Sequence, residues 1–576
     1  MALPLPNASR IAAPWAIFFL GLALRLWGID FGFPLLSNFY VRPDETLIVT
    51  PAVRFFDNSG DPHFYVYPAF MMALCAALFQ MKFAFSDAPT IAADFVLDAS
   101  SYFLLARLVS AAAGAATVLV VYAITRRLTS RSGAIAAALL FAVSPLAVRD
   151  AHFGVTDTLL ALLCAATVSA LLRYLEAGPA EARRRLIYVA VFLGLAVATK
   201  YPAAVLASVV LAAVILKNDG IKKEGLIQAL LLIATAATLF ALINPYLFVK
   251  PAAADGLRGI LSVVFGQQPG AGGWSPASAV LQMMRPLRHG PGESVGLILC
   301  ALGMVWPVKE TSVSRLRLVL LLAVGAWLLL LIFSRHLLYY RYVLSLLPLL
   351  AVFAGKGVSD LLHVTAARAW RFTMVAGVAL LAGHGLWTCH KTDRLLARED
   401  SRAVAGRWLR ENVSPEVPIF LFVGPEAEPQ VPESAASIHR RIQYARSLYG
   451  TAAGEVVAQF YRLYLEGLAE LGEKGATRYE VFRDANVAAS AAPIVAVVRS
   501  QYPVALTSGG INAAELPKGK IIRRKKIKAL PLDEPQSYEF DRIDAFFLPF
   551  NRLSDLKRPG PTLEITLLER DQIQSE

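Results

Sequence analysis

The stretch IAAPWAIFFLGLALRLW at residues 11–27, with NFYVRPDE at residues 38–45 after it, decides the fold class of this chain. The first segment is almost entirely apolar, so it predicts a membrane span. The acidic pair Asp44-Glu45 then follows in a loop at the membrane surface. Carboxylates beside hydrocarbon are costly unless they are paired or used, which makes this pair a candidate functional site. A structural explanation is equally open, because Pro43 suits a first helical turn, where acids complement the helix dipole.

The composition agrees with a chain built for lipid. Of 576 residues, 56% are hydrophobic and only 17% charged, and the mean hydropathy is +0.52. These values predict a polytopic membrane protein with room for one soluble domain. The four cysteines are scattered without CxxC spacing, which argues against a disulfide framework or a zinc site. No small-residue cleavage site follows residues 11–27, so we expect this segment to be a retained signal anchor.

Apolar stretches recur along the first 390 residues. They lie roughly at 11–27, 63–85, 101–125, 133–148, 157–175, 186–199, 202–216, 226–248, 292–307, 315–333, 337–354 and 371–388. Basic links follow at 126–131, 183–185, 217–223, 309–317 and 356–371. The positive-inside rule places these links in the cytoplasm, and it explains the net charge of +13 better than nucleic-acid binding does.

The number of crossings follows from these links. If the N-terminus and residues 126–131 are both cytoplasmic, the chain between residues 28 and 125 crosses the membrane an odd number of times. Either residues 63–85 do not span the membrane, or a further crossing lies near residues 86–100. The aromatic start His63–Pro68 favours the first option, in which this outer segment lies in the interface or dips into the membrane. The result is about eleven spans with interfacial helices, and two long outer loops at about 28–100 and 249–291.

The same topology gathers unusual ionisable residues on the outer face. No P-loop, GxGxxG after a strand or HExxH motif accompanies them. The outer face lacks nucleotide sugars, so a transferase there needs a lipid-linked donor. A sugar on a polyprenyl phosphate fits, because its tail lies in the bilayer and its phosphate is a good leaving group. One carboxylate then acts as base on the acceptor hydroxyl, while cations stabilise the phosphate.

Four residues carry this hypothesis most directly. Asp44 is the candidate base, with Glu45 orienting it or contacting the acceptor. Lys200, between two short apolar runs, is a candidate phosphate ligand; its alternative role is to snorkel to the headgroups. Arg341, in the cluster Tyr339–Tyr342, is a second candidate, and anchoring in the aromatic belt is an equal alternative.

Further candidates lie on the same face. His152 and Asp157 form a second polar cluster, although Asp157 after Thr156 also fits the N-cap of the next span. Possible acceptor or phosphate contacts are Arg149, Arg285, Arg288, His336 and Tyr340. No ligand cluster argues for a metal, so we expect no cofactor beyond the lipid-linked substrate; the sequence leaves a divalent metal open.

The order of these motifs resembles a known family. Arg42-Pro43-Asp44-Glu45 is followed by Ala106–Ser110, Ser144-Pro145, His152–Asp157, Ala198–Tyr201 and Tyr340–Tyr342. This order, over about residues 11–390, is similar to the dolichyl-phosphate-mannose protein mannosyltransferases and their bacterial relatives, including the lipid A aminoarabinose transferases. The resemblance implies a GT-C-fold membrane glycosyltransferase with Asp44 as the catalytic acidic residue, Asp157 in the second acidic loop and Lys200 near the donor phosphate. The MIR domain of eukaryotic protein-modifying members has no counterpart, which puts a protein acceptor in doubt.

Hydropathy falls after residue 390, so residues 391–576 predict a small α/β domain on the outer face. Helices are expected at 399–412 and 456–471, and strands at 417–422, 494–498 and 563–567. The segment Lys518–Lys528 holds seven basic residues. It contacts anionic headgroups or glycans, or it is a solvated strand or hairpin.

The leading hypothesis is therefore an inverting glycosyltransferase of the inner (plasma) membrane. It takes a monosaccharide from a polyprenyl phosphate and passes it to a glycan, glycolipid or protein acceptor, with no nucleic-acid partner. A transporter or lipid flippase is the chief alternative. Against it, the charged residues cluster at one face, and no two-fold hydropathy repeat is evident. A third possibility is a non-catalytic scaffold whose outer domain binds envelope glycans.

Overall fold

The computed structural model describes residues 8–39, 41–251, 275–308, 310–334, 339–365, 367–472, 478–483, 492–500, 520–529, 538–541 and 547–569. The chain divides into two compact units. The first comprises Met1–Leu26, Asp61–Ala73 and Arg107–His390, and the second comprises Trp27–Gly60, Leu74–Ala106 and Lys391–Glu576. Two segments of the predicted first outer loop thus belong to the same unit as the C-terminal region. The domain boundary at residues 390/391 stays a prediction.

The described helices up to residue 396 cover most of each predicted apolar stretch; residues 63–69 precede the helix Phe70–Phe83, and residues 335–338 lie outside the described part of the chain. In chain order the helices are α1 (Ala8–Leu26), α2 (Pro43–Val53), α3 (Phe70–Phe83), α4 (Ile91–Leu97), α5 (Ala99–Leu128), α6 (Arg131–Ala142), α7 (Pro145–Asp150), α8 (Thr156–Glu176), α9 (Pro179–Thr199), η1 (Tyr201–Val205), α10 (Leu206–Lys217), α11 (Lys223–Ile243), α12 (Tyr246–Val249), α14 (Pro276–Leu287), α15 (Glu293–Val305), α16 (Thr311–Phe333), η2 (Tyr340–Val343), α17 (Leu347–His363) and α18 (Arg368–Leu396). In the described part of the chain, five helices are long and apolar enough to cross a membrane. These are Ala99–Leu128, Thr156–Glu176, Lys223–Ile243, Thr311–Phe333 and the stretch Arg368–Asn412, within which α18 ends at Leu396. Shorter apolar helices accompany them, and the count of about eleven spans stays a prediction.

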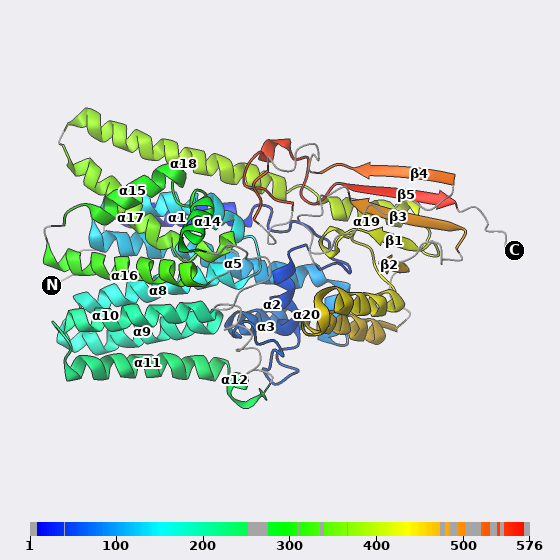
Figure 1. The fold of residues 1–576 in the computed structure, drawn as a ribbon, viewed down its shortest axis with the longest axis horizontal. Helices are drawn as coiled ribbons and strands as arrows, with labels where there is room; N and C mark the ends of the chain where they lie inside the picture. Colours follow the sequence, from blue (N-terminus) through cyan, green and yellow to red (C-terminus); the bar gives the residue numbers. More distant parts are fainter. Residues whose placement is uncertain are drawn as a thin grey trace. The chain divides into compact units, whose positions relative to one another are not determined.

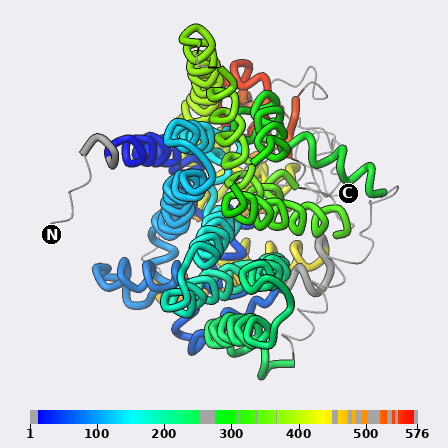
Figure 2. The backbone as a smooth tube through the Cα atoms, turned by 90° about the vertical axis from the view of Figure 1, so that its left-hand side faces the viewer, coloured from blue at the N-terminus to red at the C-terminus, as the bar shows by residue number. Residues whose placement is uncertain are grey.

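Within the first unit, α8, α9, α10 and α11 run side by side, and Figure 2 shows them nearly end on (Figures 1 and 2). Glycine allows other helices of this unit to approach closely. A Cβ at Gly303 of α15 would lie 2.0 Å from the carbonyl oxygen of Phe353 in α17, and one at Gly133 of α6 would lie 2.7 Å from that of Gly355. Close backbone approach is a main source of helix association in lipid, so these contacts explain why α17 packs against both neighbours.

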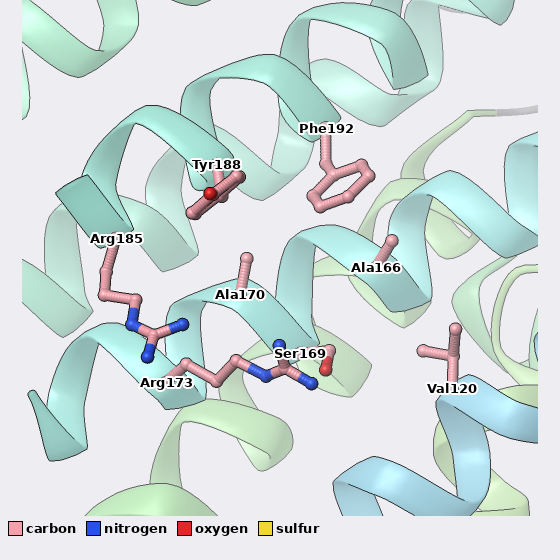
Figure 3. Close-up of a pocket in the computed structure, with 8 residues that line it drawn as sticks. All are labelled: Val120, Ala166, Ser169, Ala170, Arg173, Arg185, Tyr188 and Phe192. Atoms are coloured by element: carbon pink, nitrogen blue, oxygen red, sulfur yellow. The ribbon is translucent and has the colours of Figure 1, made fainter.

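Helices α8 and α9 form a helical hairpin. Helix α8 ends at Glu176, and α9 begins at Pro179 after the two-residue link Ala177-Gly178. The two helices therefore run antiparallel, and part of their packed faces is drawn in Figure 3. The hairpin carries the basic residues Arg173 and Arg185 near its turn, and Asp157 lies in the first turn of α8 at the opposite end.

In the second unit, the described strands form one five-stranded sheet of order β2-β1-β3-β5-β4. The strands are β1 (Ile419–Phe422), β2 (Val481–Arg483), β3 (Ile494–Ser500), β4 (Lys520–Ile527) and β5 (Leu563–Glu569). Strand β1 pairs parallel with β2 and β3, whereas β5 pairs antiparallel with β3 and β4. Trp408 and Leu409 of α19 (Ser401–Asn412) join the buried cluster on one face of this sheet. The predicted α/β character of the C-terminal region is confirmed in part, by this sheet and α19.

The C-terminal elements agree with the sequence except at the start of one helix and at β2, where no strand is predicted. The predicted helix 399–412 is α19, and Asp400 caps it by accepting the amide N–H of Arg402 at 2.8 Å. The predicted helix 456–471 is wrong at its start, because α20 runs over Ala435–Leu471. Ser434 caps it by accepting the amide N–H of Ser437. The basic segment forms the edge strand β4, whose exposed lysines and arginines block further strand pairing.

Candidate active site

A cavity of about 190 Å³ lies within the first unit. Its walls come from the segment before α3 and from α8, η1, α16 and η2. The lining residues are Val66, Tyr67, Asp157, Leu160, Lys200, Tyr201, Pro202, Trp327, Leu330, Leu331, Ser334, Arg341, Tyr342 and Ser345. Most of the wall is aliphatic or aromatic, and the charged groups are confined to three side chains. Such a mixture fits a ligand with an apolar part and one charged group.

The three charged residues of the cavity were all predicted site residues. Lys200 ends α9, and its Nζ donates a hydrogen bond to Oδ1 of Asp157 at 2.7 Å. Arg341 lies in η2, with its Nε 4.0 Å from Oδ2 of the same carboxylate. All three side chains are at least nine-tenths buried. Buried charges are stable only when paired, so Asp157 holds both cations in place.

Aromatic rings surround these cations. The Nζ of Lys200 lies 5.5 Å from the ring centre of Tyr67 and 5.4 Å from that of Tyr342. The guanidinium of Arg341 lies 4.7 Å from the ring centre of Tyr339. Cation–π contacts at such distances stabilise a desolvated cation without neutralising it. The cavity therefore combines two positioned cations with apolar walls, as binding of a lipid phosphate requires.

Asp157 does not cap its helix, so the structural alternative for it is wrong. Helix α8 begins at Thr156 and its N-cap is Val155, which places Asp157 inside the first turn. A carboxylate there complements the positive end of the helix dipole. Its direct partners are nevertheless Lys200 and Arg341, which come from distant parts of the chain.

The other candidates of the first unit do not line this cavity. His152 is buried, and its Nδ1 lies 3.0 Å from the carbonyl oxygen of Val148. Arg149 is buried with its NH1 3.4 Å from Asp150. Tyr340 stacks on His289 at 6.2 Å between ring centres. Arg285 and Arg288 are exposed at the end of α14, and His336 lies outside the described residues, as do residues 252–274 of the long outer loop. The roles assigned to these residues stay predictions.

Asp44 and Glu45 lie in the second unit, in the first turn of α2. This helix starts at Pro43, so the helix-start interpretation of the motif is confirmed. It does not exclude a chemical role. The side chain of Asp44 is 20% exposed, and Oδ2 lies 3.5 Å from NH1 of the buried Arg42. Asp44 therefore stays partly accessible beside a buried cation. Whether it meets Lys200 in one site stays a prediction.

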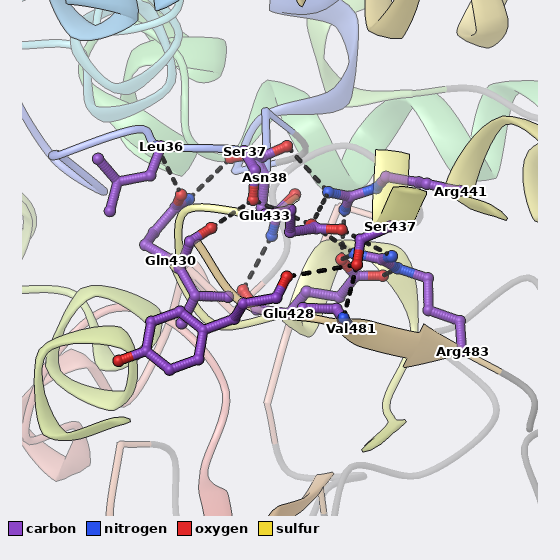
Figure 4. Close-up of polar contacts among 12 residues, drawn as sticks. Leu36, Ser37, Asn38, Glu428, Gln430, Glu433, Ser437, Arg441, Val481 and Arg483 are labelled. Carbon is purple, nitrogen blue, oxygen red and sulfur yellow. Dashed lines mark hydrogen bonds and ion pairs between the residues drawn. The ribbon is translucent and has the colours of Figure 1, made fainter. Parts of the chain in front are cut away.

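The chain just before Asp44 is held by an ion-pair network within the second unit (Figure 4). Arg441 of α20 and Arg483 of β2 alternate with Glu428 and Glu433, and all four side chains are at most 4% exposed. Arg483 donates to both carboxylates at 2.7 Å. Burial alone would raise the pKa of Glu433, but Arg483 and Arg441 beside it hold that pKa below its usual value.

This network reaches into the loop at residues 36–38. Arg441 donates to the carbonyl oxygen of Ser37 at 2.9 Å, and the Ser37 hydroxyl donates to Glu433 at 3.0 Å. Gln430 donates to the carbonyl oxygen of Asn38 at 2.7 Å and accepts the amide N–H of Leu36. The neighbouring Phe39 is buried among aromatic rings of the same unit. The loop preceding α2 is thus fixed in backbone and side chain.

Two comparisons with known proteins identify the fold. Residues 95–248, which include Asp157 and Lys200, match the family model described as Dolichyl-phosphate-mannose-protein mannosyltransferase. ArnT of Cupriavidus metallidurans in the apo state superposes with a TM-score of 0.50 at 15% identity, over 84% of this chain and 93% of that one. The chain has the GT-C fold. The resemblance predicted from the sequence is confirmed.

Other solved GT-C structures are more distant. The oligosaccharyltransferase AglB of Archaeoglobus fulgidus, in complex with an inhibitory peptide and a dolichol-phosphate, matches with a TM-score of 0.45 at 14% identity, over 71% of this chain. This chain spans 58% of the length of that protein. The Pmt1-Pmt2 complex of S. cerevisiae matches with a TM-score of 0.34 at 16% identity, over 47% of this chain and 36% of that one. No curated protein matches the sequence.

Sequence reasoning missed two parts of this GT-C chain. Tyr67 and Trp327 line the cavity, but aromatic residues in membrane segments are too common to single them out. The network residues Glu428, Glu433 and Arg483 have no motif, since they are spread over the chain and meet only in the folded domain.

Proposed function

We propose that this protein is an inverting glycosyltransferase of the inner (plasma) membrane, working on the outer face. It transfers a monosaccharide from a polyprenyl-phosphate donor to a hydroxyl or phosphate of a glycan, glycolipid or protein. The observation that carries the proposal is the apolar cavity in which Asp157 holds Lys200 and Arg341. The family match over residues 95–248 supports the same donor class, because its namesake donor is a lipid-phosphate sugar.

The chemistry is a single displacement. The acceptor oxygen forms a bond to the anomeric carbon, and the bond from that carbon to the phosphate oxygen breaks with its electron pair. The proton of the acceptor passes to Asp44, which acts as general base. Lys200 and Arg341 stabilise the negative charge that develops on the departing polyprenyl phosphate. One displacement inverts the configuration of the sugar.

The roles of the remaining residues follow from their contacts. Asp157 positions Lys200 and Arg341 and does not act on the substrate directly. Glu45 is buried next to Asp44 in the first turn of α2, and it orients the base or contacts the acceptor. The C-terminal region positions the base through its ion-pair network, because this network fixes the loop at residues 36–38 before α2. The network consists of Glu428, Glu433, Arg441 and Arg483. Correct alignment of the base with the acceptor accounts for a large part of the rate enhancement of such an enzyme.

The test compares Asp44→Asn with Lys200→Gln. Mass spectrometry of envelope glycans from a deletion strain first identifies the missing sugar and its acceptor; the variants are then assayed in proteoliposomes. Asp44→Asn should lower transfer by about 10²- to 10⁴-fold and leave binding of undecaprenyl phosphate unchanged. Lys200→Gln should weaken that binding. A flippase would instead move lipid across vesicles with both variants and form no glycosylated product, which would overturn the proposal.

A further inference from the structure

A second cavity lies in the first unit, apart from the candidate active site. Its volume is about 350 Å³, and it is bounded by α5, α8 and α9 (Figure 3). The lining residues are Val120, Ala166, Ser169, Ala170, Arg173, Arg185, Tyr188 and Phe192. The two cavities have no lining residue in common. The proposed transfer reaction assigns no role to this groove.

The groove is charged at one end and apolar at the other. The lining residues lie on one face of each helix, because they are spaced three or four positions apart. On α8 they are Ala166, Ser169, Ala170 and Arg173, and on α9 they are Arg185, Tyr188 and Phe192. Because the two helices are antiparallel and joined after Glu176, both arginines lie near the hairpin turn. Ala166 and Phe192 lie seven residues further in, which corresponds to about 10 Å along each helix. A ligand here meets cations at its head and hydrocarbon beyond.

Charge at the head end is only partly compensated. Arg185 pairs with Glu181 at 3.2 Å, and the neighbouring Arg127 pairs with Glu176. Arg173 forms no hydrogen bond or ion pair with any residue in the described part of the chain, and Figure 3 shows its guanidinium beside Ser169. Arg183 and Arg184 add two exposed positive charges at the turn. The arginines therefore exceed the glutamates, and the site favours an anion.

We propose that this groove binds an anionic glycerophospholipid of the cytoplasmic leaflet. Its phosphate lies between Arg173 and Arg185, near the Tyr188 hydroxyl, and an acyl chain follows Ala166 and Phe192. The basic residues at 183–185 place this end of the hairpin in the cytoplasm by the positive-inside rule. Basic pockets between membrane helices on that side suit anionic headgroups, whereas a soluble phosphate compound has no use for the apolar end.

The hairpin offers a matched pair of variants. Arg173→Gln/Arg185→Gln removes two charges from the groove, and Arg183→Gln/Arg184→Gln removes two charges from the same turn outside it. Purified full-length protein is exchanged against phosphatidylcholine vesicles with or without phosphatidylglycerol, and bound lipid is counted by native mass spectrometry. The groove pair should weaken phosphatidylglycerol binding by roughly 10- to 30-fold, as two lost contacts to an anionic headgroup predict. The control pair should change it less than about threefold, since exposed charges are screened.

Two further measurements determine which part of the lipid the groove recognises. Phe192→Ala should weaken binding of long-chain phosphatidylglycerol and leave that of the dihexanoyl form unchanged. Equal losses in both double variants would overturn the proposal in favour of general surface attraction. Competition by inorganic phosphate as strong as that by phosphatidylglycerol would overturn the lipid assignment, as would stronger binding of undecaprenyl phosphate in the same groove. The melting temperature of each variant in detergent checks that the fold is retained.

Discussion

The candidate cavity of the first unit and the ion-pair network of the second both bury charged groups, yet they do so differently. In the network, two arginines and two glutamates satisfy one another and fill the space between them. In the cavity, one aspartate holds two cations beside about 190 Å³ of open volume. A closed set of charges fixes structure, whereas charged side chains that line an open volume are accessible to a ligand. Burial of charge by itself therefore does not identify a functional site.

The largest expected effect comes from opening the network. Glu433→Ala leaves Arg441 and Arg483 short of one carboxylate in a fully buried place, and removing one partner of a buried pair costs about 3–5 kcal/mol. We expect a lower melting temperature of the purified protein, and a loss of sugar transfer through the loosened loop at residues 36–38. Glu564→Ala, at a partly exposed pair with Arg499, is the control. Equal destabilisation by the two variants would contradict the distinction between closed and surface pairs.

A second prediction concerns Glu426, a buried carboxylate of the same unit without such a network. Its Oε1 has no hydrogen-bond partner among the described residues, and burial raises its pKa to about 7. A raised pKa stabilises the fold fully below the ordinary value of 4.5, and this contribution is lost as pH rises through 7. The loss amounts to at most about 3 kcal/mol.

Glu426→Gln should therefore remove a fall in stability between about pH 4.5 and pH 7, the range that separates the two pKa values. The lowered pKa of Glu433 acts in the opposite sense, because its contribution is lost only as pH falls below the ordinary value. Melting curves of both proteins over this range make the measurement. Parallel pH profiles of wild type and variant would show that Glu426 is charged in the folded state.

The cavity should respond to substitution in binding more than in stability. Lys200→Met keeps the apolar stem of the side chain and removes the charge, while Arg341 remains beside Asp157. We expect undecaprenyl phosphate to bind about 10- to 100-fold more weakly, or about 1.4–2.8 kcal/mol, from the loss of one charge-assisted contact. The melting temperature should move less than in Glu433→Ala. A large fall in melting temperature with unchanged binding of undecaprenyl phosphate would instead assign Lys200 a structural role.

The smallest effect is expected at exposed pairs. Arg315→Gln breaks an ion pair with Asp219 in which both side chains are well exposed. Such pairs contribute about 0–1 kcal/mol, so the melting temperature and sugar transfer should both stay within error of the wild type. A clear loss of sugar transfer would show that the Arg315–Asp219 pair has a function unrelated to the cavity and to the ion-pair network.

Several candidate site residues could be identified from the sequence because the motifs that contain them are local. Asp44 lies in the first turn of α2, Lys200 caps the end of α9, and Asp157 lies in the first turn of α8, so hydropathy alone placed these residues at helix ends. The same reasoning failed for Glu428, Glu433 and Arg483, whose partners lie far away in the chain. It also set the start of α20 about twenty residues too late, because a mixed polar surface hides the helical period there.

The sequence by itself determined that this chain is a membrane protein, which segments are helical, and which acidic and basic residues lie at their ends. These properties follow from local hydropathy and charge, since the bilayer excludes unpaired polar groups wherever they occur. Only the tertiary structure showed that Asp157 contacts both Lys200 and Arg341. It also showed that an ion-pair network of residues far apart in the sequence holds the loop before α2. Pairing of buried charges depends on three-dimensional distance, which no local pattern in the chain records.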